Sequence, residues 1–206
     1  MQFTDLNQIY KKSIMIWLIS LTVMIFLIII IGGLTRLTDS GLSMVDWQPI
    51  LGTIPPLNNT QWLNAFNEYK LFPEFLYINK NMTLDEFKYI FWWEWFHRFF
   101  ARLIGIVFLI PFIYFLFKKY LNSFFYKRLS IIFSLGLIQA LVGWWMVKSG
   151  LTHDPYVSPY RLTFHLTNAV IIYALLFWTS IEYYNSKLAR FFYSNTKELL
   201  ILISIF

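Results

Sequence analysis

Two histidines of this 206-residue chain lie inside apolar segments, at similar distances from the segment ends. His97 is about six residues into a run that begins near residue 91, and His165 is about four residues into one that begins near 161. If both runs cross a membrane in the same direction, the two imidazoles lie within about one helical turn of the same depth. An ionisable group inside a membrane span is costly and is therefore a candidate for function. Two such imidazoles on facing helices could be the axial ligands of one haem iron.

Small residues follow both histidines at one-turn intervals. A flat macrocycle needs small side chains where its face presses on a helix, and residues three to four apart share a helical face. These candidates for contact with the macrocycle are Ala101 and Gly105 after His97, and Ala169 after His165. Three arginines near the same level could pair with haem propionates, which are carboxylates at the wet edge of a haem: Arg98, Arg102 and Arg161.

An acidic residue lies one helical turn before the first histidine. Glu94 precedes His97 by three residues and Arg98 by four. It could act as a catalytic group, or it could simply form an ion pair with Arg98 on the same helix face. The residue spacing leaves these two interpretations open.

Simpler roles than metal binding are possible for each histidine taken alone. One histidine alone in a membrane helix more often hydrogen-bonds a neighbouring helix than binds a metal, and it is the matched pair that favours ligation. His153 lies beside Asp154 and Pro155, between two apolar runs. We expect it to be an exposed loop residue.

The composition indicates a chain embedded in lipid. Hydrophobic residues make up 58% of the chain and charged residues 14%, and the apolar residues form long runs rather than a dispersed pattern. The net charge of +6 does not indicate nucleic-acid binding, because the basic residues flank the apolar runs in short clusters. The chain has no cysteine, so a metal site would have to use histidine, methionine or carboxylate ligands.

The elements that must position these residues are four membrane spans. We predict an all-α integral membrane protein, a four-transmembrane-helix bundle with a long outer loop that contains short helices. The predicted spans are about 13–33, 91–117, 129–147 and 161–181, and the outer loop is 34–90. Thr83, followed by Asp85 and Glu86, is predicted to cap the helix that leads into the second span.

The distribution of charge predicts the orientation. The turn between the second and third spans holds four basic residues and no acid: Lys118, Lys119, Lys127 and Arg128. The long loop instead holds six acids: Asp39, Asp46, Glu68, Glu74, Asp85 and Glu86. By the positive-inside rule, residues 1–12 and the 118–128 turn are cytoplasmic, and the long loop faces outward. We therefore expect a multi-pass membrane protein whose N-terminus is cytoplasmic, with a haem-binding transmembrane domain over 13–185.

The end of the chain begins another apolar run. Residues 186–206 are predicted to be a cytoplasmic connection and the start of a fifth helix, which stops after about half the length that a span needs. Either the sequence is a piece of a longer protein or this tail lies on the membrane surface, and we expect the former.

Four blocks of the sequence resemble one enzyme family. GGLTRLTDSGLSMVDWQPILGTIPP (32–56), EFKYIFWWEWFHR (86–98), GWWMVKSGL (143–151) and VSPYRLTFHL (157–166) are similar to haem A synthases. The absence of cysteine resembles the alphaproteobacterial and mitochondrial branch of that family. The resemblance covers the chain from the first span onward and corresponds to the N-terminal four-helix half plus the start of helix five.

The resemblance implies an oxidoreductase that converts the C8 methyl group of haem O to the formyl group of haem A. Members have eight helices in two similar halves, each with a histidine pair. The family's Glu-x-x-His motif falls on Glu94 and His97, and its next histidine falls on His165, which makes these the expected catalytic carboxylate and iron ligands. Haem O and haem A would occupy this half, and a haem b would belong to the half that is missing here.

The resemblance also implies partners. Haem O synthase would supply the substrate, cytochrome c oxidase would receive the product, and the sequence leaves a homo-oligomer open.

Two other interpretations of the function stay open. A cytochrome b-like electron carrier with two histidine ligands would have the same composition and histidine placement, and an inactive fragment of the synthase would share every motif. We expect water to be the oxygen source, because two histidine ligands leave no open position on the iron.

Overall fold

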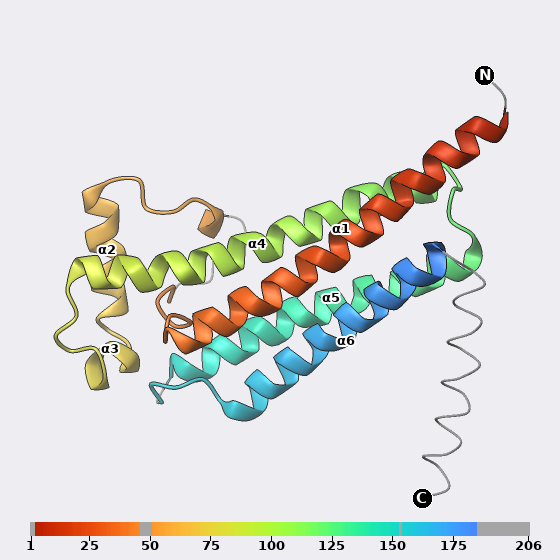
Figure 1. Ribbon diagram of the computed structural model, residues 1–206. Helices are drawn as coiled ribbons and strands as arrows, with labels where there is room; N and C mark the ends of the chain where they lie inside the picture. Colours follow the sequence, from red (N-terminus) through yellow and green to blue (C-terminus); the bar gives the residue numbers. More distant parts are fainter. Residues whose placement is uncertain (1–2, 46–50, 153, 185–206) are drawn as a thin grey trace, which may run out of the picture.

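The computed structural model describes residues 3–45, 51–152 and 154–184, with side chains described from Tyr10 onward, Leu51 excepted. Within these ranges every regular element is a helix, and four long helices run side by side (Figure 1). The long helices are α1 (Phe3–Leu37), α4 (Leu84–Phe117), α5 (Ser123–Gly150) and α6 (Pro159–Tyr184). The short ones are η1 (Leu51–Thr53), α2 (Asn59–Tyr69) and α3 (Pro73–Tyr77). The predicted all-α fold with four long helices and a loop holding short ones is confirmed.

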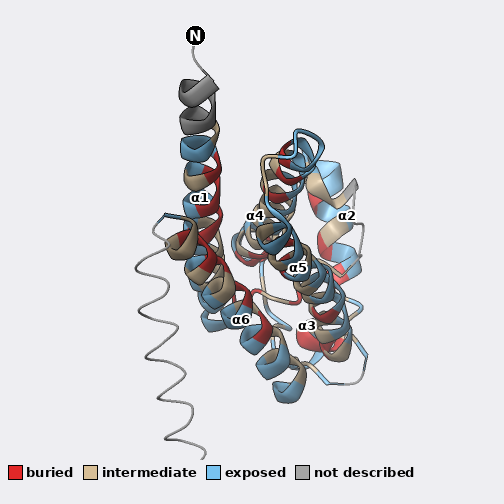
Figure 2. Cartoon of the chain, turned by 90° about the vertical axis from the view of Figure 1, so that its right-hand side faces the viewer, coloured by how far each residue is buried: buried red, intermediate tan, exposed pale blue. Residues whose placement is uncertain are grey.

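Each long helix has an apolar stretch that is long enough to cross a membrane. Many large apolar side chains on their outer faces are exposed, among them Ile110 at 65% and Leu141 at 64%. Exposed and buried residues divide the helices lengthwise (Figure 2), as expected where lipid covers the outside of a bundle. The protein is therefore a multi-pass membrane protein.

The four helices are arranged so that α4 and α6 stand at opposite corners. α1 packs against both α4 and α6, α5 packs against α6, and a looser contact between α4 and α5 closes the bundle. Because α5 intervenes in the chain, α4 and α6 run in the same direction, and both begin at the end where α2 and α3 lie (Figure 1). We call this the loop end of the bundle.

The buried core of the bundle lies toward the opposite end. Trp17 of α1 packs against Phe108 and Phe115 of α4, and its indole Nε1 donates to the carbonyl of Val107 at 2.8 Å. Arg128 of α5 and Glu182 of α6 form an ion pair near the same end. This packing holds the four helices together and leaves the loop end to carry polar residues.

A cap, which we define as the described residues between 38 and 83, covers the loop end. Its α2 crosses beside the start of α4 (Figure 1), where Trp62 and Phe66 pack against Phe87 and Phe91. The predicted helix cap at Thr83 is confirmed as a capping box with Glu86. This capping box starts α4 at Leu84, before the predicted span at 91, so the first turns of α4 belong to the cap region. The predicted fifth helix in 186–206 and the predicted loop position of His153 lie outside the described residues.

Candidate functional site

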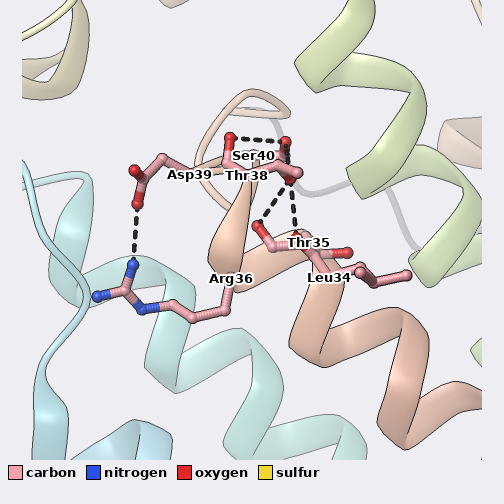
Figure 3. A network of polar contacts seen from close by, with 6 residues as sticks. All are labelled: Leu34, Thr35, Arg36, Thr38, Asp39 and Ser40. Atoms are coloured by element: carbon pink, nitrogen blue, oxygen red, sulfur yellow. Dashed lines mark hydrogen bonds and ion pairs between the residues drawn. The ribbon is translucent and has the colours of Figure 1, made fainter.

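The end of α1 turns the chain back into the bundle. Thr38 donates from Oγ1 to the carbonyl of Leu34 at 2.9 Å, and Ser40 N donates to the carbonyl of Thr35 at 3.0 Å (Figure 3). Asp39 adopts a positive φ of 47° and pairs with Arg36 at 2.9 Å. Aspartate tolerates this left-handed conformation better than most residues, because its short side chain bonds locally. The turn directs the following segment inward.

That inward segment reaches the buried carboxylate of Glu94. Glu94 is only 2% exposed, and its Oε2 accepts from Ser43 Oγ at 2.7 Å and from Met44 N at 2.8 Å. Its Oε1 forms a close ion pair with Arg98, which also donates from Nη2 to the carbonyl of Met44 at 3.1 Å. We call Ser43, Met44, Glu94 and Arg98 the clasp. The clasp ties the cap to α4 one turn before His97.

A second buried carboxylate lies within the cap. Glu74 is 5% exposed, and it accepts from the hydroxyl of Tyr69 at 2.9 Å, which in turn accepts from Asn79 Nδ2 at 2.8 Å. Burial raises the pKa of Glu74 to about 7, and it also raises the pKa of the Tyr69 hydroxyl. Glu74 therefore changes charge near neutral pH, unlike an exposed glutamate.

The two histidines come from the opposite corner helices, and glycines of the other two helices lie against them. A Cβ atom added at Gly32 of α1 would lie 3.2 Å from His97 Nε2. One added at Gly143 of α5 would lie 3.0 Å from His165 Cε1. Both imidazoles are half-buried, and they are close enough to each other to interact electrostatically. All four helices thus contribute to one site, two with imidazoles and two with glycines.

His165 lies in a network of neutral amides between α5 and α6. Gln139 Nε2 donates to the carbonyl of His165 at 3.1 Å and lies 3.2 Å from His165 Nε2. Asn168 Nδ2 donates to Gln139 Oε1 at 2.7 Å and to the carbonyl of Leu135 at 3.1 Å. The other ring nitrogen of His165, Nδ1, is buried without a hydrogen-bond partner.

These features fit a haem held between two imidazoles. A buried polar nitrogen without a hydrogen bond is costly, and a metal ligand is one role that accounts for it. The glycines beside the rings let the imidazoles approach the helix backbones, where any side chain would displace them. The residues that could hold a haem are therefore His97 and His165.

Comparison with known proteins supports the resemblance of the four blocks. The family model described as cytochrome oxidase assembly protein (COX15-CtaA) matches residues 15–206. The chain belongs to this family. No solved structure matches the chain.

Curated relatives of this family member are named Heme A synthase. The relative from Nitrosospira multiformis is 49% identical over 184 residues, which are 89% of this chain and 52% of the relative. The relative from Flavobacterium psychrophilum is 49% identical, over 84% of this chain and 51% of its own. The relative from Parvibaculum lavamentivorans is 44% identical, over 91% of this chain and 54% of its own. The chain spans about half the length of the curated relatives it matches.

Two of the three predicted arginines donate hydrogen bonds to backbone carbonyls. Arg98 belongs to the clasp, where it bonds to the carbonyl of Met44. Arg161 donates from Nη1 to the carbonyl of Trp145 at 2.8 Å, and its guanidinium lies over the Trp145 ring. Arg102 is partly buried on α4, while Ala101 is exposed and Ala169 is half-buried. The roles of these residues toward a haem stay predictions.

Sequence reasoning missed several residues around the histidines. The sequence alone did not place Gly32 or Gly143 beside an imidazole. Gln139 and Asn168 carried a usable signal, because amide side chains inside apolar runs are unusual and need partners. Ser43 and Met44 carried none, since their contacts with Glu94 link positions about fifty residues apart.

Proposed function

We propose that this chain is a haem A synthase, an oxidoreductase that oxidises the C8 methyl group of haem O to the formyl group of haem A. The naming of its curated relatives supports this function. The observation that carries the proposal is the pair of imidazoles at opposite corners of the bundle, each lying against a glycine of another helix. Because the chain spans half the length of those relatives, a haem b is expected in the other half of the full-length enzymes.

His97 and His165 would hold the haem through their imidazole nitrogens. Once bound, the haem supplies an iron that accepts electrons and a porphyrin methyl group that can be oxidised. We propose water as the oxygen source: two hydroxylations of the methyl group and the loss of one water would give the formyl group, and the four electrons and four protons released would pass to an external electron acceptor and to water. Glu94 is 2% exposed, so its carboxylate is shielded from bulk water.

Glu94 is the proposed catalytic residue, acting through its charge. Both of its oxygens already accept hydrogen bonds, from Ser43 and Met44 on one and from Arg98 on the other. These bonds hold the carboxylate in one position. Its negative charge would stabilise positive charge that develops as electrons leave the methyl carbon, because a preorganised charge needs no reorganisation during the reaction.

The proposed location is a bacterial inner membrane, with the N-terminus in the cytoplasm. The basic turn between α4 and α5 would be cytoplasmic, and the cap and clasp would face outward. The haem site then lies near the outer face, in a transmembrane domain over 13–185. Haem O would come from haem O synthase, and haem A would pass to the assembly of cytochrome c oxidase.

Pigment analysis tests this function. The chain is expressed in a host that makes haem O but no haem A, and haems are extracted from its membranes and identified by chromatography and mass. We expect haem A in membranes with the wild-type chain and none with His97→Ala or His165→Ala. Bound but unaltered haem would reject the synthase activity and favour the cytochrome b-like electron carrier. Absence of any bound haem would reject both.

A further inference from the structure

The packing between α4 and α5 changes along the length of the bundle. In the half that holds the buried core, two stacked aromatic pairs join the helices. Phe108 stacks on Phe133 with ring centroids 5.8 Å apart, and Phe112 stacks on Tyr126 with centroids 6.1 Å apart. These pairs close the seam between α4 and α5 in that half of the bundle.

Nearer the histidines, the same helix faces carry small residues. Gly105 and Ala101 continue the face of Phe108 along α4, and Ala140 lies two turns after Phe133 on α5. All three small residues are exposed, and a Cβ added at Gly105 would meet no described atom within 4 Å. The facing helices therefore have no large side chains here to fill the seam. We call Ala101, Gly105 and Ala140 the lateral opening.

The loop end of the same seam is covered by the cap. Leu42 is 3% exposed and packs against the end of α5, where a Cβ added at Gly150 would lie 2.7 Å from it. The next two residues, Ser43 and Met44, bond to Glu94 of α4 in the clasp. One segment of the cap thus bridges α5 and α4. The lateral opening lies between this bridge and the aromatic pairs.

The lateral opening lies at the level of both imidazoles. Ala101 follows His97 by one helical turn on the same face of α4. On α5, Gly143 follows Ala140 by one turn and lies against the ring of His165. The outer faces of these helices carry exposed apolar side chains, as a surface in lipid does. The opening therefore connects the site with the bilayer, while the cap separates the site from water.

We propose that the haem enters the site edge-on from the bilayer through the lateral opening, and that the apolar farnesyl tail of haem O remains in lipid there. The statement about the tail rests on the proposed function, whereas the entry route applies to any haem that the two histidines bind. A route through lipid suits this ligand, because transfer of an apolar tail into water is unfavourable. Small residues suit the passage of a flat macrocycle between two helices.

The test places a removable bulky group in the lateral opening. The chain has no cysteine, so Ala140→Cys introduces a single thiol. A lipid-soluble benzyl methanethiosulfonate converts that thiol to a mixed disulfide, which a reductant removes. Leu141→Cys is the matched control, because Leu141 is the next residue of α5 and is 64% exposed on its outer face. Each protein is reconstituted in liposomes, haem is supplied from a second population of liposomes, and the Soret absorbance measures uptake.

We expect the modified Ala140→Cys protein to take up haem about tenfold more slowly than the unmodified variant, because binding that first requires a structural change is slower. Reductant should restore the rate, and modification of Leu141→Cys should leave uptake unchanged. When the reagent is added after protohaem has bound, haem loss should also become slower, whereas a group that merely crowded the haem would make loss faster. The inference is wrong if uptake is unchanged, if both modified variants are slowed equally, or if modification makes haem loss faster.

The position of the farnesyl tail is tested by the reactivity of the introduced thiol. Bound haem O should protect Ala140→Cys from the reagent more than bound protohaem does, because only haem O has a tail to leave in the opening. The thiol of Leu141→Cys should react at the same rate with either haem bound and with none. Equal protection of Ala140→Cys by the two haems would overturn the statement about the tail.

These outcomes are distinguishable from a failure of the proposed function. A chain that takes up haem through the opening but forms no haem A would overturn the synthase activity and leave the entry route standing. Haem A formation together with unchanged uptake in the modified Ala140→Cys protein would overturn the entry route and leave the activity standing.

Discussion

The surroundings of the two histidines differ in chemistry. On the His97 side, Glu94 and Arg98 of α4 form an ion pair, and Ser43 and Met44 of the cap bond to that pair at the loop end of the bundle. On the His165 side, the neutral amides of Gln139 and Asn168 bridge α5 and α6. Charged groups are less costly near the aqueous boundary than deep in hydrocarbon, where uncharged donors and acceptors satisfy one another at lower cost. We therefore expect changes in the cap to affect the surroundings of His97 more than those of His165.

The largest effect is expected on haem A formation when the charge of Glu94 is removed and the histidines are kept. Glu94→Gln keeps the shape of the side chain but removes the negative charge, so haem A formation should fall about 100-fold, the order seen when one preorganised electrostatic group is lost. Bound haem should be retained. Chromatography of extracted haems and the haem-to-protein ratio measure the two quantities.

The control for that substitution is Glu68→Gln, on an exposed face of α2. It should leave both quantities at the wild-type level. If Glu94→Gln forms haem A at the wild-type rate, the carboxylate has only the structural role of fastening the cap.

The next largest effect is expected on haem loss when the glycines beside the two rings are replaced. Gly143→Ala places a methyl group 3.0 Å from His165, whose ring is already held by Gln139 and cannot easily turn away. Gly32→Ala places one 3.2 Å from His97. We expect about tenfold faster haem loss in Gly143→Ala and a smaller increase in Gly32→Ala, measured by transfer to a haem-scavenging protein.

Gly136→Ala on α5 is the matched control, since nothing lies within 4 Å of a Cβ at that position. Alanine favours a helix over glycine, so thermal stability should not fall in Gly136→Ala. Equal haem loss in Gly136→Ala and Gly143→Ala would show that the space beside His165 is not required.

A smaller effect is expected from loosening the clasp. Ser43→Ala removes one of the hydrogen bonds to Glu94 and costs about 1 kcal/mol, so haem A formation should fall about fivefold while haem stays bound. Ser134→Ala, whose hydroxyl bonds only to the carbonyl of Ser130 on its own helix, should be neutral. Recovery of the rate in Ser43→Thr, which restores a hydroxyl, would separate the hydrogen bond from packing.

The smallest effect on haem binding is expected from pH, which changes the stability of the cap. Burial raises the pKa of Glu74 to about 7 in the folded cap, above its ordinary value of 4.5. The folded cap then binds more protons than the unfolded chain between these values, so its stability is greatest at low pH and falls as the pH rises through 7. The loss between pH 5 and pH 8 should be about 2–3 kcal/mol.

Amide hydrogen exchange of peptides from α2 and α3 measures this change. Exchange should be faster at pH 8 than at pH 5, after correction for the intrinsic rate, and Glu74→Gln should remove the difference. Haem loss should change little, because Glu74 belongs to the cap and not to α5 or α6. An equal pH response in peptides around His165 would contradict the separation of the two sides.

The parts of the fold that depend on local pattern were predictable from the sequence. The four helices follow from long apolar runs, and the start of α4 follows from Thr83 and Glu86, because a capping box needs only residues three apart. The shared level of His97 and His165 follows from counting residues along two parallel helices.

The parts that depend on contacts between distant segments were not predictable in the same way. The pairing of Glu94 with Arg98 was one of two open interpretations, but its bonds to Ser43 and Met44 depend on how the turn at Asp39 directs the chain. The position of each glycine against an imidazole depends on the rotation of four helices about their axes, which periodicity alone does not set.

The ferric electron paramagnetic resonance spectrum of the purified chain tests the central claim most directly. If His97 and His165 share one iron, the wild-type protein gives a low-spin signal typical of two imidazole ligands, and replacing either histidine with alanine abolishes it. A low-spin signal with two imidazole ligands that survives either substitution would contradict the account.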